Sequence, residues 1–439
     1  MDERSGRAER VVTRRAGRRL VATYLAELPP DRPLEAAEAF ATGQSIGTWI
    51  PVPGITASMR RRHGARVLEL SRGTPSQEAG GEPAGDRWIL RVEFPTENFG
   101  PQFPMLLTTL VGNDPSTSLA ARLVDVELPP EYAAAFPGPQ FGVEGWRQLT
   151  GVHDRPLLLN MIKPCTGYSP RAGADLLEGP ARGGADLIKD DELLADPSFN
   201  RVAERARVYR RRLEAVESET GHRARYIANV TARAGRLVDT ARAARDGGAD
   251  AVMVNALAVG LDALQALAES GTGVPILAHT ACSEVITGGA ATGIGQAVLF
   301  GKLLRLAGAD AVLTSTPYGR RPLARAVAGR TVEWLLAPRD ALRPALPMLA
   351  GGVTRDIVGL LVRDAGIDVM VGVGGAIQGH PGGAEAGARE IRIAIDEAVA
   401  SIVAAQEAAA GQDGSHDQLS GTGPDRGATV EGARRTSTQ

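Results

Sequence analysis

The spacing of apolar positions changes along the chain, and each part has its own pattern. From residue 20 to about residue 113, strand-like and helix-like stretches alternate without a regular repeat, which is typical of a small α+β domain. The strand-like stretches are LVATYLAEL (20–28), RVLEL (66–70) and RWILRVEFP (87–95), the helix-like stretch is PLEAAEAFATGQS (33–45), and FPMLLTTLVGN (103–113) fits either a helix or a strand.

The second pattern is a series of eight short β-like apolar runs separated by Ala-, Leu- and Arg-rich segments with helical spacing. Nearly the same phrase introduces four of the runs: GGAD at 183–186 and 247–250, AGAD at 307–310 and AGID at 365–368. A glycine just past a helix, followed by an Asp that begins a strand, makes this phrase an internal repeat of βα units. We therefore predict a closed (β/α)8 barrel, with an open doubly wound sheet as the alternative. The eight runs are 155–164, 185–191, 224–231, 249–256, 274–280, 309–316, 346–352 and 367–375.

The predicted fold class is α/β, with an N-terminal α+β (ferredoxin-like) domain over 16–145 and a (β/α)8 TIM barrel over 146–406. A Pro-rich stretch, LPPEYAAAFPGPQFG, marks the linker between them. Residues 1–15 and 407–439 are polar and poor in large apolar side chains, so we expect both to be disordered.

Composition excludes several classes of function. The formal net charge is −2, which gives no reason to expect a nucleic-acid or membrane surface. No apolar run approaches the ~20 residues that a membrane span needs, and the N-terminus lacks the apolar core of a secretion signal. The two cysteines, Cys165 and Cys282, make no disulfide framework and suggest a reducing cytoplasm. We expect Cys282 to be a small buried hydrophobic residue.

The stretch GGADLIKDDE (183–192) is the strongest candidate for chemistry. A buried strand that ends in Lys189, Asp190, Asp191 and Glu192 cannot bury these charges without partners, because an unpaired buried charge is very costly. Carboxylate oxygens favour a divalent cation, although a solvated loop is the simpler alternative for an isolated KDDE. Alternation along the strand points Asp190 away from Asp191, so we do not expect it to be a ligand.

The other predicted strands also end in polar residues. The carboxyl ends of barrel strands meet at one mouth, so Lys163, Lys189, His279 and the acids of KDDE should converge there, with Asn229 and Asn255. The last two strands end in the glycine pairs Gly351–Gly352 and Gly374–Gly375. Backbone amides at such glycines can approach an anion closely, which favours a phosphorylated substrate.

These motifs, in this order and at this spacing, resemble the large subunit of ribulose-bisphosphate carboxylase, and more closely the RuBisCO-like proteins that share its fold but not its reaction. The resemblance runs from about Val21 to about Ala400. It is carried by GQSIGTW (43–49), VGN (111–113), MIKP (161–164), GGADLIKDDE (183–192), LAHT (277–280), TSTPYGR (314–320), AGG (350–352) and GGAIQGHP (374–381).

The resemblance implies a role for each matching residue. Lys189 would take up CO2 as a carbamate and, with Asp191 and Glu192, bind Mg2+ through three oxygen donors. Lys163 would be the enolising base or proton shuttle, and His279 would lie near the reacting carbons. The cofactor implied is therefore Mg2+, held by carbamylated Lys189.

The resemblance also implies how a phosphate is bound and how subunits associate. The phosphate site would be formed by Thr48 and Trp49 together with the two glycine pairs. Thr48, Trp49 and Asn113 would come from the small domain of a second subunit, which implies a homodimer.

Departures from the carboxylase pattern narrow the range of possible substrates. Thr280, Leu313 and Ala350 stand where the carboxylase has an arginine, a histidine and a serine that hold the second phosphate and the sugar. Losing a charged hydrogen bond costs a dianion about 1.5–3 kcal/mol, so we expect a sugar substrate with one phosphate. The loop-six lysine of the carboxylase corresponds to Arg320, and ribulose-bisphosphate carboxylation is not expected.

Several functions remain compatible with this core. We favour decarboxylation of a 3-oxo sugar-acid phosphate of the 3-oxo-isoapionate-4-phosphate type. The main alternative is an enolase or isomerase of a methylthio-ketopentose phosphate; Asn113, where the methionine-salvage enolase has a lysine base, argues against the enolase. Two further alternatives are a non-catalytic binding or regulatory barrel and an ordinary flavin- or phosphate-binding barrel.

Overall fold

The computed structural model describes residues 19–47, 52–72, 82, 86–117, 119–320, 322–338 and 342–416. The expected disorder of residues 1–15, and of residues 417–439 in the C-terminal tail, lies outside the described residues. No described helix is both long enough and apolar enough to cross a membrane.

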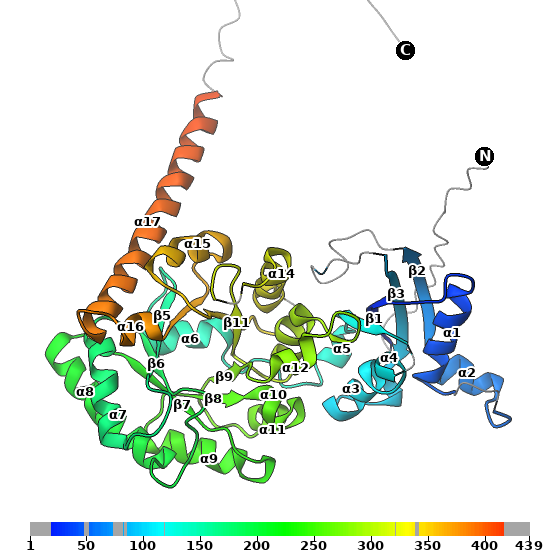
Figure 1. Ribbon diagram of the computed structural model, residues 1–439, viewed down its shortest axis with the longest axis horizontal. Coiled ribbons are helices and arrows are strands. Elements are labelled where there is room, and N and C mark those ends of the chain that lie inside the picture. Colours follow the sequence, from blue (N-terminus) through cyan, green and yellow to red (C-terminus); the bar gives the residue numbers. More distant parts are fainter. Residues whose placement is uncertain are drawn as a thin grey trace, which may run out of the picture.

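The N-terminal domain is built on one mixed sheet, which lies to one side of the barrel (Figure 1). Its strand order is β10-β4-β1-β3-β2, and the central strand β1 pairs antiparallel with both β3 and β4. The strands are β1 (Arg19–Ala26), β2 (Arg66–Arg72), β3 (Trp88–Pro95), β4 (Ala121–Glu127) and β10 (Gly293–Ile294). The short strand β10 comes from the barrel and pairs in parallel with β4, so the two domains share a sheet edge.

Helices cover this sheet and close the small core. The stretch 103–113, which fitted a helix or a strand, is a helix, because Phe103, Leu106 and Leu110 fall on one buried face at helical spacing. Tyr24 of β1 donates its hydroxyl hydrogen to the Leu110 carbonyl at 2.9 Å and ties sheet to helix. The helical elements here are α1 (Pro33–Gly43), α2 (Ala57–His63), η1 (Thr96–Asn98), α3 (Phe103–Val111) and α4 (Asp114–Thr117).

The predicted Pro-rich linker is an ordered, packed segment. It contains the short helix α5 (Pro130–Ala133), and Tyr132 and Phe136 are buried. Their rings make edge-to-face contacts with each other and with Phe99 and Phe103. Proline and glycine correctly marked a break in secondary structure, but the aromatic residues between them anchor the segment to the core.

The barrel is closed, as predicted, and all eight predicted runs form its strands. All strand pairs are parallel, in the order β11-β12-β13-β5-β6-β7-β8-β9. The strands are β5 (Leu157–Met161), β6 (Leu187–Lys189), β7 (Arg225–Asn229), β8 (Ala251–Asn255), β9 (Ile276–His279), β11 (Ala311–Ser315), β12 (Leu346–Ala350) and β13 (Met370–Val373).

Helices surround the barrel, and two predicted boundaries need correction. Helix α6 begins at Gly142, so the boundary placed at 145/146 falls inside a helix. Helix α17 continues to His416, nine residues beyond residue 407, where the predicted tail starts, and projects from the body of the protein (Figure 1). The helices are α6 (Gly142–Thr150), α7 (Pro170–Arg182), α8 (Val202–Thr220), α9 (Ala234–Gly247), α10 (Ala256–Val259), α11 (Leu261–Glu269), α12 (Ser283–Thr287), η2 (Val298–Leu303), α13 (Leu304–Leu306), α14 (Arg325–Leu336), α15 (Arg355–Ala365), α16 (Gly375–Gln378) and α17 (Ala384–His416).

The repeated Asp of the GGAD phrase fastens neighbouring strands at the amino-terminal end of the barrel. In three of the four repeats its backbone N–H donates to a carbonyl at the start of the preceding strand, and its carboxylate accepts the N–H of that same residue. The pairs are Asp186 with Leu158, Asp250 with Tyr226 and Asp310 with Ile276.

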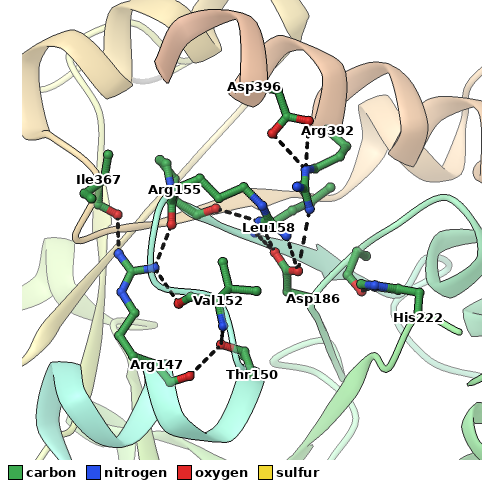
Figure 2. Close-up of polar contacts among 12 residues, drawn as sticks. Arg147, Thr150, Val152, Arg155, Leu158, Asp186, His222, Ile367, Arg392 and Asp396 are labelled. Carbon is green, nitrogen blue, oxygen red and sulfur yellow. Dashed lines mark hydrogen bonds and ion pairs between the residues drawn. The ribbon is translucent and has the colours of Figure 1, made fainter. Parts of the chain in front are cut away.

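The first of these clamps is extended by arginines. Asp186 also binds the buried Arg155 through two hydrogen bonds, of 2.6 and 2.7 Å, and lies 3.9 Å from Arg392 of α17 (Figure 2). The fourth Asp of the series, Asp368, instead pairs with Arg147 at 2.8 Å. This end of the barrel is therefore held by charge pairs, and the opposite end is left for chemistry.

Candidate functional site

The candidate site lies where the barrel strands end at their carboxyl termini. Lys163 follows β5, the KDDE residues end and follow β6, and His279 is the last residue of β9. Because these strands are parallel members of one closed barrel, their carboxyl ends share one rim. The predicted residues of the barrel domain therefore come together as expected.

Lys163 and Asp191 form an ion pair at this rim. The lysine Nζ donates to Asp191 Oδ2, and it also lies 3.2 Å from the sulfur of Cys165. Burial alone would lower the pKa of Lys163, but Asp191 and Cys165 raise it above its ordinary value. Burial would raise the pKa of Asp191, yet Lys163 and the backbone N–H of Leu193 hold it below its ordinary value. In this state Lys163 is an ammonium ion and Asp191 a carboxylate.

Lys189 lies deeper than Lys163. Its side chain is fully buried, and its Nζ donates to the carbonyl of Asp190 at 2.9 Å. Burial lowers the pKa of Lys189 to about 8, against the opposing charges of Glu192 and Asp191. Roughly a tenth of this amine is therefore neutral at pH 7, far more than for an ordinary lysine, and only a neutral amine reacts with CO2.

Asp190 faces away from Asp191, as predicted from strand alternation. Its Oδ2 accepts hydrogen bonds from Arg205, from the Tyr226 hydroxyl at 2.7 Å and from the backbone N–H of Asn229 at 2.9 Å. Both the Asp190 and the Arg205 side chains are fully buried. Arg205 therefore neutralises Asp190 on the side of the strand away from Asp191. Their ion pair also fixes the main chain that carries Asp191 and Glu192.

Two asparagines hold the backbone of the KDDE turn. Asn229 Nδ2 donates to the carbonyls of Asp191 and Glu192, both at 3.1 Å, and Asn255 Nδ2 donates to the Glu192 carbonyl at 3.0 Å. The sequence pattern placed both residues at the mouth without a role. The sequence did contain a signal for this role, because both asparagines end the two strands that directly follow β6.

The His279 ring lies between Glu192 and the loop that follows β9. Its Nε2 is 3.6 Å from Glu192 Oε2, and its Nδ1 accepts the backbone N–H of Ala281 at 3.1 Å. Burial, together with the charges of Lys189 and Lys163, lowers the pKa of His279 to about 3. The imidazole is therefore neutral at physiological pH.

The glycine pairs border the same mouth. A Cβ added to Gly374 would come within 3.5 Å of Lys163 Cε, whereas one added to Gly375 or Gly351 would meet no atom within 4 Å. Gly351 and Gly352 have φ angles of 105° and 88°, which side chains rarely adopt. The Arg320 N–H donates to the Gly351 carbonyl at 3.0 Å, so loop six rests on the first glycine pair.

The residues that replace the second-phosphate ligands offer no cation. Thr280 turns its hydroxyl to the Leu313 carbonyl at 3.2 Å. Leu313 packs against the apolar cluster of the barrel interior, to which Ala350 belongs. This side of the mouth is closed by backbone and apolar contacts.

Of the three residues expected from the N-terminal domain, the structure describes Asn113. Thr48 and Trp49 lie outside the described residues. Asn113 lines a cleft of about 710 Å³ whose lining residues all belong to the N-terminal domain, between Glu27 and Ala120.

Asp191, Glu192 and Lys189 are the groups available to hold a divalent cation. Among the described residues, no cluster of three or more His, Cys, Asp or Glu side chains could bind a metal. A carbamate on Lys189 would add a third oxygen donor to the two acids, as the resemblance implies. The buried amine of Lys189 fits this role, because its lowered pKa favours the neutral form that reacts with CO2.

One cysteine prediction is wrong. Cys282 is exposed, with a left-handed φ of 70°, and precedes helix α12. The short polar turn after β9 leaves it outside the core. Cys165, partly exposed beside Lys163, lies near the mouth as expected.

Comparison with known proteins agrees with this geometry. The chain matches the ribulose bisphosphate carboxylase large chain models, for the N-terminal domain over residues 14–132 and for the catalytic domain over residues 142–415. It is 39% identical to the ribulose bisphosphate carboxylase-like protein of Archaeoglobus fulgidus over 384 residues, 87% of each chain. It is 38% identical to the 2,3-diketo-5-methylthiopentyl-1-phosphate enolase of Geobacillus kaustophilus, covering 87% of this chain and 92% of that one.

The fold comparison reaches the same family. The crystal structure of the octameric ribulose-1,5-bisphosphate carboxylase/oxygenase of Pyrococcus horikoshii matches with a TM-score of 0.80 and 32% identity, covering 88% of this chain and 91% of that one. Together with the two domain matches, these similarities show that the chain belongs to the ribulose bisphosphate carboxylase large chain family, as a RuBisCO-like protein.

Proposed function

We propose that this RuBisCO-like protein enolises a keto sugar derivative that carries one phosphate, and that it does so with Mg2+. One observation carries the proposal: an amine, Lys163, is held at the mouth against Asp191, and a second, buried amine, Lys189, lies beside the same acids. A base and a metal site side by side are what abstraction of a proton next to a carbonyl needs.

Asp191, Glu192 and the carbamate of Lys189 would hold the ion. Bound there, Mg2+ would supply a Lewis acid that stabilises the oxygen of an enediolate. Lys163, whose side chain is 35% exposed, is the amine that could take a proton from the substrate and return it. For Lys163 to act as a base its ion pair with Asp191 must loosen, because that carboxylate favours the ammonium form.

The substrate class follows from what surrounds the mouth. The two glycine pairs offer backbone amides to one phosphate. On the other side Thr280 and Leu313 leave no charged donor for a second phosphate. The proposed substrate is therefore a monophosphate with a carbonyl near the reacting carbon.

The leading candidate reaction is enolisation of a 2,3-diketo-5-methylthiopentyl phosphate or a related methylthio-ketopentose phosphate. A relative of 38% identity over most of both chains bears this enolase name. That similarity favours the enolase over the decarboxylation that the sequence pattern alone put first.

Decarboxylation of a 3-oxo sugar-acid phosphate is kept as the second candidate because of one residue. Asn113 stands where the resemblance implies a lysine base in the methionine-salvage enolase. An amide cannot take a proton at neutral pH, whereas a decarboxylation needs only a group to reprotonate the enolate, a part that Lys163 could play.

A substrate panel in D2O separates these reactions. Purified protein with Mg2+ and bicarbonate would be given the diketo phosphate, methylthio-ketopentose phosphates and 3-oxo sugar-acid phosphates. Loss of the α-proton signal without CO2 release supports the enolase, and CO2 release supports the decarboxylase. If no compound exchanges a proton or loses CO2, the proposal fails.

Matched lysine variants locate the activity. Lys163→Arg should reduce turnover by at least ~10²-fold, since general base catalysis alone contributes that much. Lys189→Arg should reduce turnover at least as strongly, because it removes a proposed ligand of the metal ion. Lys302→Arg is the control, because Lys302 binds Asp125 and the Val126 carbonyl, away from the mouth.

A further inference from the structure

Two amide side chains are bonded to each other behind strand β5. Leu157 and Leu159 of β5 belong to the apolar cluster of the barrel interior, so by alternation Asn160 faces the helices outside the barrel, as Leu158 does. Asn160 is fully buried, and its Oδ1 accepts a hydrogen bond from Gln378 Nε2 at 2.8 Å. Because a buried amide needs its partners, this bond favours a single arrangement of the two segments.

The same asparagine also binds the neighbouring strand. Its Nδ2 donates to the carbonyl of Val373 at 2.9 Å, and Val373 is the last residue of β13, directly before Gly374. Gln378 is the last residue of the single-turn helix α16, which begins at Gly375. Asn160 therefore holds the segment that carries the second glycine pair at two points, through the main chain before the pair and through the Gln378 side chain after it.

Helix α16 needs such an anchor. A single turn makes few hydrogen bonds for the residues that it orders, so it is not stable on its own. The side chain of Ile377 is fully buried, but apolar packing is not directional. The Gln378 side chain supplies directional bonds, to Asn160 at 2.8 Å and more weakly to the Leu176 carbonyl of α7 at 3.4 Å. The bond to Asn160 thus fixes the turn against β5.

Strand β5 also leads to the proposed base. Lys163 follows Asn160 by three residues, and a Cβ placed on Gly374 would lie 3.5 Å from Lys163 Cε. One strand therefore sets the position of the lysine and, through its asparagine, the position of the glycine pair. The covalent skeleton of a substrate fixes the distance between its phosphate and its reacting carbon, so the protein must hold a matching spacing.

We propose that Asn160 and Gln378 are positioning residues that hold the glycine pair Gly374–Gly375 at a set distance from Lys163. The inference rests on the proposed function, because it takes this pair as part of the phosphate site and Lys163 as the group that moves the proton. The two amides make no contact with the substrate, and they act through the backbone that they hold.

Binding of inorganic phosphate tests the anchor without any reaction. In a 31P NMR titration, Gln378→Leu should bind phosphate roughly 5–10-fold more weakly than the wild type, the factor that one hydrogen bond is typically worth. The double variant Asn160→Leu/Gln378→Leu should bind no more weakly than Asn160→Leu alone, because the two amides act through one bond. Gln148→Leu, which loses an exposed bond to Glu144, is the control and should bind like the wild type.

A matched variant of the same helix separates positioning from stability. Ile377→Val removes one buried methyl group from α16 and leaves both amides in place. It should lower the free energy of unfolding, measured in urea, while its phosphate affinity stays within about twofold of the wild type. If phosphate affinity falls with stability to the same extent in Ile377→Val and Gln378→Leu, the role of Gln378 is structural only and the proposal is wrong.

The outcomes also distinguish this inference from the proposed function. If Gln378→Leu weakens phosphate binding but the wild type enolises no keto sugar phosphate, the proposed reaction fails and the anchor stands. If the wild type turns over such a substrate and Gln378→Leu binds phosphate as the wild type does, the reaction stands and the positioning role is wrong. A wild type that binds no phosphate would overturn the positioning role as well.

The effect on turnover should follow the same pattern. For any keto sugar phosphate that the wild type enolises, Gln378→Leu should lose up to ~10²-fold in kcat/KM, since a small misplacement far from the chemistry can cost that much. Gln148→Leu should keep the wild-type value. Equal values of kcat/KM for Gln378→Leu and the wild type would contradict the positioning role.

Discussion

At the scale of single residues, burial gives two of the three lysines different properties. The chain contains three lysines: Lys163, Lys189 and Lys302. Lys163 is partly exposed and paired with Asp191, so its pKa is raised, whereas Lys189 is fully buried and its pKa falls to about 8. The two lysines at neighbouring strand ends are thus suited to different tasks. Lys163 stays charged as long as it is paired with Asp191, whereas Lys189 can react in its neutral form.

The small number of lysines makes carbamate formation directly observable. With 13C-bicarbonate and Mg2+, the wild type should show a lysine carbamate signal in its 13C NMR spectrum. Lys189→Arg should lose the signal and Lys302→Arg should keep it. A signal that persists in Lys189→Arg would show that another amine is modified.

The buried carboxylate of Asp310 should make the free energy of unfolding depend on pH. Its carboxylate accepts the backbone N–H groups of Gly142 and Ile276, yet burial outweighs them and raises its pKa to about 6. Because the folded pKa exceeds the ordinary value of 3.8, the folded state holds this proton more tightly than the unfolded state. The contribution of Asp310 to stability is therefore fully present below about pH 4 and is lost as the pH rises through about 6.

Chemical denaturation across this pH window tests the assignment. Asp310→Asn should remove a downward slope in the free energy of unfolding worth at most about 3 kcal/mol between pH 4 and pH 6. Asp250→Asn, at the equivalent but partly exposed clamp, controls for loss of the hydrogen bond itself. An unchanged slope in Asp310→Asn would refute the assignment.

At the scale of elements, the spacing of apolar residues and the repeated GGAD phrase predicted the strands and the βα repeat. They did not predict that the Asp of this phrase bonds to the preceding strand. Eight apolar runs of strand length, spaced by helical segments, were sufficient for the barrel. That the Asp of GGAD reaches back to the preceding strand depends on parallel pairing across about 25 to 35 residues, which no local pattern contains. The packed linker was missed for a related reason: Tyr132 and Phe136 are buried by Phe99 and Phe103, which lie about 30 residues earlier.

The clamp at β6 should be the most sensitive of these contacts. Asp186→Asn breaks a buried ion pair with Arg155 and should lower the free energy of unfolding by about 3–5 kcal/mol, because a buried guanidinium is left unpaired. Asp175→Asn, an exposed acid paired with Arg212, should cost less than about 1 kcal/mol. Urea unfolding followed by circular dichroism measures both, and similar losses would mean that the clamp carries little of the stability.

At the scale of the whole molecule, the residues expected at the site come from two domains, and of the N-terminal ones the structure describes Asn113. Asn113 lines a cleft formed by the N-terminal domain alone, and the lysines and acids line the barrel mouth. A second copy could bring the two together, as the family resemblance implies. The apolar side chains of Leu193, Phe199 and Val285, exposed on loops and a helix after β6 and β9, are suited to such an interface.

Mixing two inactive variants tests this shared site. If Asn113 of one subunit completes the mouth of another, Lys163→Met and Asn113→Ala proteins should be inactive alone and should recover roughly a quarter of wild-type activity after subunit exchange. A mixture of Lys163→Met and Lys189→Met proteins is the control, because both changes lie in the barrel and no subunit pairing restores an intact mouth. Recovery in neither mixture would argue against sharing, provided that ultracentrifugation shows a dimer.

The amino-acid sequence by itself determined the barrel, the strand ends that carry chemistry and the family to which the chain belongs, because periodicity, strand length and short motifs are local properties. Tertiary structure decided which of those side chains are charged, paired or turned away. Burial lowers the pKa of Lys189, Asp191 holds Lys163 as an ammonium ion, Arg205 neutralises Asp190, and the N–H of Ala281 donates to the His279 ring. These properties depend on neighbours brought close by folding and on the low dielectric of the interior, and neither can be read from the order of residues alone.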